Sequence, residues 1–137
     1  MHRRREFLEA IRDQIKTISG RGGVYIQQVA PVRAAWPCFT IFPETESVET
    51  LTIHGRPRPQ DRTFNVTITA WIRGTPDDEK VSADMDAIGN QIEAAMNSNF
   101  GADDCTLILT EFIVSEDEPE IHRLVLTYAI RYFTTES

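Results

Sequence analysis

The sequence predicts an α+β fold, in which two amphipathic helices pack on a single mostly antiparallel sheet of about five to six strands. The first observation is an alternation of apolar and polar residues over 63–73, which is typical of a strand with one buried face. Its apolar members are Phe64, Val66, Ile68, Ala70 and Ile72. The second observation is a helical repeat with spacings of four, three, four and three residues, formed by Val81, Met85, Ile88, Ile92 and Ala95. A one-sided helix directly after a one-sided strand favours a sheet covered by helices.

The chain before residue 63 is expected to form one amphipathic helix and three short strands. These elements span residues 3–18, 24–26, 38–42 and 47–53. Pro43 is expected to end the strand at 38–42, because proline has no N–H to donate to a central ladder. The polar, proline-rich residues 54–62 are expected to form a projecting hairpin loop.

The chain after residue 73 is expected to form one helix and one hairpin. The helix should begin at Thr75 and Pro76, because a threonine can cap the first amides and a proline suits the first helical position. Strands at 106–115 and 122–133 should pair across an acidic turn. The second of these strands alternates, with one face formed by Leu124, Leu126, Tyr128, Ile130 and Tyr132. No repeat or linker interrupts the pattern, so a single domain over residues 1–137 is expected.

Composition narrows the function classes. No apolar run approaches the roughly 20 residues of a membrane span, so no membrane partner is expected. The net charge is −7, which argues against sequence-specific nucleic-acid binding. This charge is uneven, because residues 1–62 hold ten Lys/Arg against seven Asp/Glu, and residues 63–137 hold four against fourteen. Such asymmetry would let copies associate head to tail or let the protein sit between two unlike partners.

Residues with catalytic or metal-binding potential form no recognisable constellation. Nucleotide-binding, serine-nucleophile and zinc-helix motifs are absent from the sequence. His2, His54 and His122 are expected at the surface, and Cys38 and Cys105 as two buried thiols. The sequence therefore predicts a protein that is not an enzyme and uses no cofactor or metal.

Two features are candidates for partner contact. The basic loop contains Arg56, Arg58 and Arg62, which could contact another protein, contact DNA, or have no partner. A protein contact is the favoured interpretation. Trp71 falls on the polar face of the long strand, where either residues 31–37 or a neighbouring subunit would cover it.

The order of motifs resembles the small tail terminator proteins of long-tailed phages, of the lambda minor tail protein type. The resembling segments read RREFLEAIRDQI, WPCFTIFPET, RTFNVTITAWIRG followed by PDDEK, and LVLTYAIRYF. This resemblance implies a hexameric ring at the head-proximal end of the virion tail, assembled in the host cytoplasm. Its implied partners are the tail tube protein and a head-completion or neck protein, and DNA would pass through the ring.

Within that family role, the ring would stop tube polymerisation and offer a surface for head joining. Arg56, Arg58 and Arg62 would then form the tube-docking loop, and Trp71 would contact the next subunit. The alternative is a small intracellular ligand-binding or regulatory domain with the same α+β fold. An enzyme with an unrecognised site is a weaker third possibility.

Overall fold

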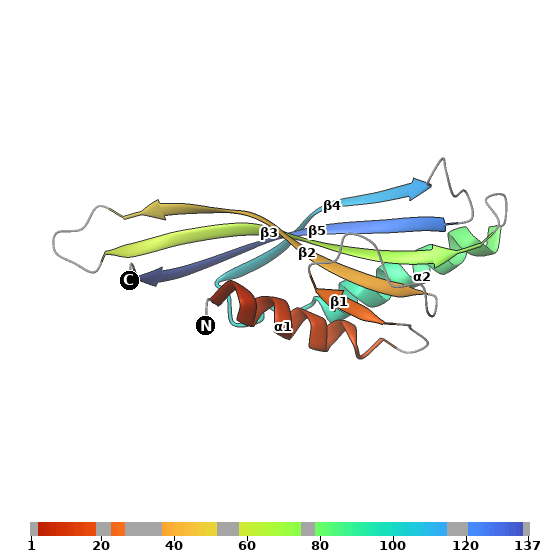
Figure 1. Ribbon diagram of the computed structural model, residues 1–137, viewed down its shortest axis with the longest axis horizontal. Helices are drawn as coiled ribbons and strands as arrows, with labels where there is room; N and C mark the ends of the chain where they lie inside the picture. The colour runs from red at the N-terminus through yellow and green to blue at the C-terminus, as the bar shows by residue number, and fades with distance from the viewer. Residues whose placement is uncertain are drawn as a thin grey trace.

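A single five-stranded sheet runs the length of the molecule, with its strands in the order β1-β2-β3-β5-β4 (Figure 1). The structure is a computed structural model that describes residues 3–18, 23–26, 37–51, 58–74, 79–114 and 121–135. The helices and strands are α1 (Arg3–Ile15), β1 (Val24–Ile26), β2 (Cys38–Thr50), β3 (Pro59–Arg73), α2 (Glu79–Ala95), β4 (Asp104–Val114) and β5 (Ile121–Thr135). Of the strand pairs within the described residues, β1 with β2 is parallel and the other three are antiparallel. The predicted α+β fold with a mostly antiparallel sheet is confirmed.

Both helices cover the same face of this sheet. The Phe7 ring of α1 lies 6.4 Å from the Phe64 ring of β3 and 5.0 Å from the Tyr132 ring of β5, measured between centroids. Gly89 lets α2 approach β5 closely, because a Cβ at this position would lie 3.2 Å from the Leu124 side chain. The predicted apolar stripes of the two helices are buried at Phe7, Leu8, Ile11, Ile15 and Ile18, and at Val81, Met85, Ile88 and Ile92, while Ala95 is half-buried.

The predicted alternation in the two central strands is also confirmed. The apolar members of β3 named above are at most 6% exposed. The apolar side chains on the same face of β5 are at most 4% exposed, and these are Leu124, Leu126, Tyr128, Ile130 and Tyr132. Burial of one large apolar side chain contributes roughly 1.5–3 kcal/mol to the free energy of unfolding, so this face holds the core.

β2 continues through Pro43, so the prediction that this proline ends a strand is wrong. β1 pairs with β2 only at residues 39–41, so among the described strands β2 is an edge from Phe42 onward. An edge position tolerates proline, because the missing N–H can face away from the ladder. Two residues of β2, between Pro43 and Glu46, oppose the single residue Asn65 in a β-bulge. The two expected strands are one bent strand, and the sheet has five strands.

The predicted loop at 54–62 is shorter than expected. Residues 59–62 belong to β3 and pair with β2 and β5 on either side. The N–H of Leu51 donates to the carbonyl oxygen of Pro59 at 3.0 Å and closes the ladder there. Residues 46–50, 59–63 and 131–135 continue the sheet beyond the N-terminal end of α1 (Figure 1), and we call them the sheet extension.

The described ends of the other elements refine the expected boundaries. α1 ends at Ile15, and one further turn, closed by the Ile18 N–H donating to the Ile15 carbonyl at 3.1 Å, keeps Ile18 buried. Thr75 and Pro76 lie outside the described residues, so the capping of α2 stays a prediction. β4 and β5 pair as expected for the C-terminal hairpin. Neither described helix has the length and apolar character needed to cross a membrane.

Candidate interaction surfaces

The three arginines assigned to the basic loop are not equivalent in the structure. Arg56 lies outside the described residues, and Arg58 is half-buried next to the start of β3. Arg62 lies within β3, so its placement in a loop is wrong. Its side chain belongs to a polar network on the face of the sheet that α1 covers. The structure therefore does not bring Arg62 to the hairpin tip.

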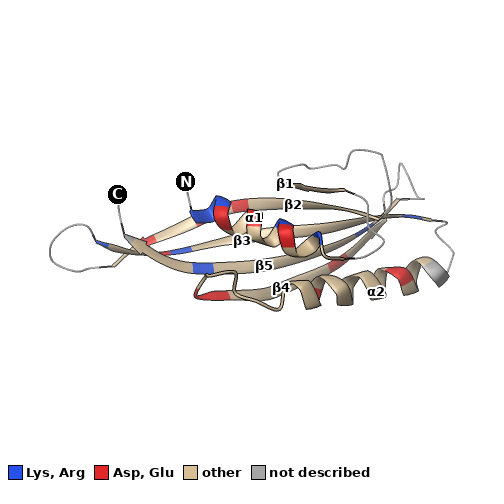
Figure 2. Cartoon of the chain, turned by 90° about the horizontal axis from the view of Figure 1, so that it is seen from below, with Lys and Arg blue, Asp and Glu red and all other residues tan. Residues whose placement is uncertain are grey.

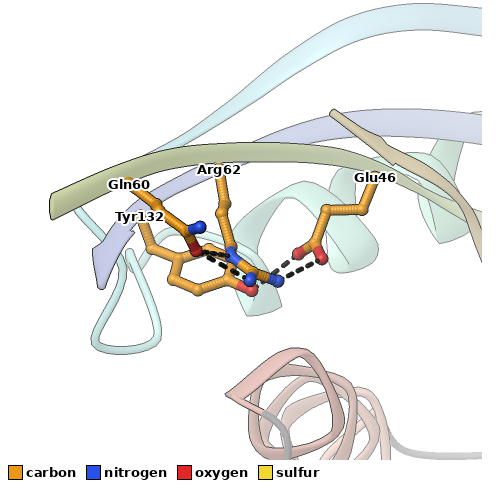
Figure 3. A network of polar contacts seen from close by, with 4 residues as sticks. All are labelled: Glu46, Gln60, Arg62 and Tyr132. Carbon is orange, nitrogen blue, oxygen red and sulfur yellow. Dashed lines mark hydrogen bonds and ion pairs between the residues drawn. The ribbon is translucent and has the colours of Figure 1, made fainter. Parts of the chain in front are cut away.

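That network links Arg62 with Glu46, Gln60 and Tyr132 (Figure 3). Arg62 Nη1 donates to Glu46 Oε2 at 3.0 Å, and Tyr132 Oη donates to Glu46 Oε1 at 2.6 Å. Arg62 Nε and Nη2 both donate to Gln60 Oε1, at 3.2 and 2.9 Å. The Glu46 and Arg62 side chains are only 10% and 22% exposed. The guanidinium charge is thus matched by a carboxylate inside the sheet extension.

The β-bulge explains why Glu46 can reach this network. Side chains of a strand point to alternate faces, so the extra residue after Pro43 shifts Glu46 onto the face shared by Phe64. Tyr132 lies on that same face and is 1% exposed. Its burial, together with the hydrogen bond to Glu46, raises the pKa of the Tyr132 hydroxyl to about 12. The hydroxyl stays protonated at neutral pH and can donate.

Trp71 lies on the opposite face of β3, as the alternation predicted. Its Nε1–H donates to Thr40 Oγ1 at 2.9 Å, and Arg123 lies over the ring with Cζ 5.3 Å from the centroid. The indole is half-buried. The bond to Thr40 satisfies its N–H within the same chain. Residues 31–36 lie outside the described residues, and the contact between Trp71 and another subunit stays a prediction.

His122 is buried, so the prediction of a surface histidine is wrong at this position. The side chain is 4% exposed, and Nε2 lies 3.2 Å from the carbonyl oxygen of Gly74. Nε2 must carry the proton in this contact, because a carbonyl oxygen can only accept. The burial of His122 could have been predicted from the sequence, because His122 is two residues before Leu124 and therefore lies on the same buried face of β5. His2 and His54 lie outside the described residues.

The sheet edge formed by β4 was missed by the sequence analysis. Four large apolar side chains on this strand are about half exposed: Ile108 (52%), Leu109 (49%), Phe112 (58%) and Val114 (51%). Among the strands that the structure describes, β4 pairs with β5 alone and is therefore an outer strand of the sheet. The signal was the pair of short apolar runs at 107–109 and 112–114, which place apolar side chains on both faces of one strand.

A groove of about 390 Å³ lies between β4 and α2. Its floor is apolar, with Met85 of α2 and Leu124 and Leu126 of β5, and Phe112 forms its β4 wall. The rest of its lining is Asp86, Gly89, Asn90, Glu93 and Thr110. We call this feature the α2–β4 groove. It combines an apolar floor with acidic side chains, which is an arrangement suited to an apolar and basic partner surface.

Reactive chemistry has little support among the described side chains. No group of three or more His, Cys, Asp or Glu in the described part of the chain could hold a metal ion. Cys38 is buried and Cys105 half-buried, and both are free thiols. Burial raises the pKa of Cys38, and burial with the nearby Asp104 charge raises that of Cys105 to about 11. Both thiols are protonated at neutral pH, where they are weak nucleophiles.

Comparisons with known proteins supply no assignment. No protein-family model matches this chain, and no curated protein matches it either. The exposed surfaces and the motif resemblance therefore carry the functional argument.

Proposed function

We propose that this protein is a tail terminator of a long-tailed phage, which assembles as a homo-oligomeric ring of six copies and caps the tail tube. The observation that supports this proposal best is the apolar outer strand β4. Its four exposed apolar side chains lie beside a strand edge that pairs with no other strand in the described part of the chain. Proteins usually protect such edges, because they pair readily with other chains. A subunit of an assembly has a neighbour to cover it.

The second line of support is the shape of the subunit. The sheet extension projects beyond the helices, so the described ends of β2 and β3, at Thr50 and Pro59, lie at one end of the elongated sheet (Figure 1). The helices cover one face of the sheet, and β4 lies at one of its edges. Separate regions are thus available for contact with neighbouring copies and for contact with a tube.

The proposed role needs recognition rather than chemistry. The ring would bind the last ring of tube protein, stop further polymerisation, and present its other side to a head-completion protein. DNA would pass through its centre. In this proposal the protein is located at the head-proximal end of the virion tail, and it uses no cofactor. The motif resemblance supplies these partners, and the subunit geometry is compatible with them.

Mass measurement of the purified protein, combined with negative-stain microscopy, tests the proposal directly. We expect concentration-dependent rings of uniform diameter and six copies. Adding them to polymerising tube protein should give tails of uniform length. A protein that stays monomeric at high concentration, with a small molecule bound in the α2–β4 groove, would contradict the proposal and favour a ligand-binding domain.

A further inference from the structure

We propose that the α2–β4 groove is the receiving half of the contact between copies, and that it takes the α1–β1 side of a second copy. This inference rests on the proposed function, because it assigns the partner within the ring. It identifies one outer edge of the sheet as acidic and apolar, and the other as basic and apolar. The two edges are complementary, so each copy can bind one neighbour on each side.

The receiving side is strongly acidic. Residues 79–114, which form α2 and β4 and the connection between them, hold seven Asp/Glu and one Lys. Asp86 and Glu93 are seven residues apart, so they lie on one flank of α2, and both line the groove beside β4. Figure 2 shows acidic residues, coloured red, along α2 and at the start of β4. Phe112 adds an apolar anchor that is 58% exposed.

The inserting side is basic because of the orientation of α1. Gln14 of α1 lines a pocket shared with Gln91 and Ala94 of α2, so the flank with Gln14 faces α2. Helix geometry, with about 100° per residue, places three basic side chains roughly 160–200° away from Gln14 around the helix. These are Arg5, Arg12 and Lys16. They therefore lie on the flank of α1 that points away from α2, next to β1, which α1 contacts.

The ion pairs on α1 and the outer strand β1 both leave the inserting side able to bind a second copy. Arg5 pairs with Glu9 at 3.2 Å and Arg12 with Asp13 at 3.4 Å, both at the surface. Surface pairs of this kind contribute little to stability, so a partner carboxylate can replace them. β1 is the other outer strand, and its residues Val24, Tyr25 and Ile26 are half-buried. Apolar surface is thus present on both edges.

The alternative of two β4 strands pairing about a two-fold axis is unfavourable. That arrangement would bring Asp86, Glu93 and Glu111 of one copy close to the same carboxylates of the other, and like charges repel. A contact between unlike surfaces avoids this repulsion. Such head-to-tail contacts form closed rings when the rotation between copies closes. The charge pattern therefore favours a ring over an isolated dimer.

Two variants, each blocked on one side, test the proposal. The receiving-side variant is Phe112→Ser with Val114→Ser, and the inserting-side variant is Arg12→Glu with Lys16→Glu. Each alone should stay monomeric where the wild type is assembled, because the contact is weakened by about 30-fold or more. An equimolar mixture should form a dimer of one copy of each and nothing larger, since only one intact contact remains. Native mass spectrometry reads both results.

The matched control is Phe42→Ser with Val48→Ser, which removes the same residue types at positions that are 42% and 48% exposed and do not line the groove. It should assemble like the wild type. Circular dichroism should show that every variant is folded. If a double variant does not fold, its two substitutions are tested one at a time. Assembly of either blocked variant alone, or a mixture that stays monomeric, overturns the inference.

The inference is also overturned if the receiving-side variant fails to assemble while the inserting-side variant still assembles, because another surface or another protein would then occupy the groove. Failure of the proposed function looks different. A wild-type protein that never assembles overturns both proposals. A wild-type ring that caps tubes, with blocked variants that do the same, overturns only the assignment of the groove.

Discussion

Tyr132 shows how a single residue joins three strands of this fold. Its ring packs against Phe7 and Phe64, and Arg3 lies over it with Cζ 5.6 Å from the centroid. Its hydroxyl donates to Glu46, whose other oxygen accepts from Arg62. β2, β3 and β5 are thereby connected on the face that α1 covers. The same side chain contributes to the core and satisfies a nearly buried carboxylate.

Tyr132→Phe tests the contribution of that hydroxyl. It keeps the ring and removes the donor to Glu46, so we expect the free energy of unfolding to fall by about 1.5–3 kcal/mol, as for a hydrogen bond to a charged group. Denaturant unfolding at neutral pH measures the loss. An unchanged midpoint would contradict the assignment, and Tyr25→Phe, a tyrosine that is half-buried on β1, is the control.

The pH dependence of stability offers a second comparison between the wild type and Tyr132→Phe. The pKa of Tyr132 is about 12 in the folded state, above the ordinary tyrosine value of 10.0. A raised pKa means that the contribution of the neutral hydroxyl is complete below about pH 10 and is lost as the pH rises toward 12. The wild type should therefore lose more stability across this range than Tyr132→Phe does.

Trp71 is expected to act in both folding and assembly. Trp71→Ala removes the hydrogen bond to Thr40 and the contact with Arg123, so the free energy of unfolding of the monomer should fall by about 2 kcal/mol. If the exposed part of the ring also contacts a neighbour, ring formation should weaken by more than this loss. Measuring unfolding at low concentration and assembly at high concentration separates the two. Equal losses would place Trp71 in the fold alone.

At the scale of elements, the sequence predicted best where one face of a strand is buried. Alternation in β3 and β5 identified the core correctly, because each strand has neighbours on both sides and one face covered by helices. The same logic failed for Pro43, since whether a strand is central or outer depends on how far β1 extends along β2. The placement of Arg62 in a loop was wrong for a similar reason. The β-bulge that brings Glu46 next to Arg62 cannot be recognised from the alternation of apolar and polar residues.

The candidate surfaces were harder to predict for a related reason. Apolar residues on both faces of β4 are equally compatible with a strand buried in the centre of the sheet. Only the strand order shows that β4 is an outer strand and that Phe112 and Val114 remain exposed. The acidic flank of α2 was visible in the sequence as an uneven charge. Its position beside β4, rather than beside α1, required the structure.

At the scale of the whole molecule, the two kinds of contact proposed here use different regions. Contacts between copies would use the two edges of the sheet, together with the sheet face that carries Trp71 if that residue meets a neighbour. Contact with the tube would use the loop between β2 and β3, at the end of the sheet extension. Because the regions are separate, a substitution can weaken binding to the tube without weakening the contact between copies.

Replacement of residues 53–57 by a two-glycine turn removes Arg56 and keeps every described residue of the ladder. Leu51 and Pro59 already close the sheet before this segment, and shortening a surface loop costs little. We therefore expect a folded protein that still forms rings but binds tubes weakly, because a positive tip facing an acidic tube surface is lost. Co-sedimentation of rings with preformed tubes measures the binding.

Arg62→Ala provides the contrast for this experiment. Arg62 pairs with Glu46 inside the sheet extension, so its loss should lower the free energy of unfolding by leaving a nearly buried carboxylate without its cation. The fraction of Arg62→Ala protein that folds should bind tubes like the wild type, because the wild-type Arg62 side chain points into the polar network and not toward the tube. Shortened-loop rings that still cap tubes at uniform length would show that docking uses another surface. Arg62→Ala rings that fold normally but fail to bind would return Arg62 to the docking site.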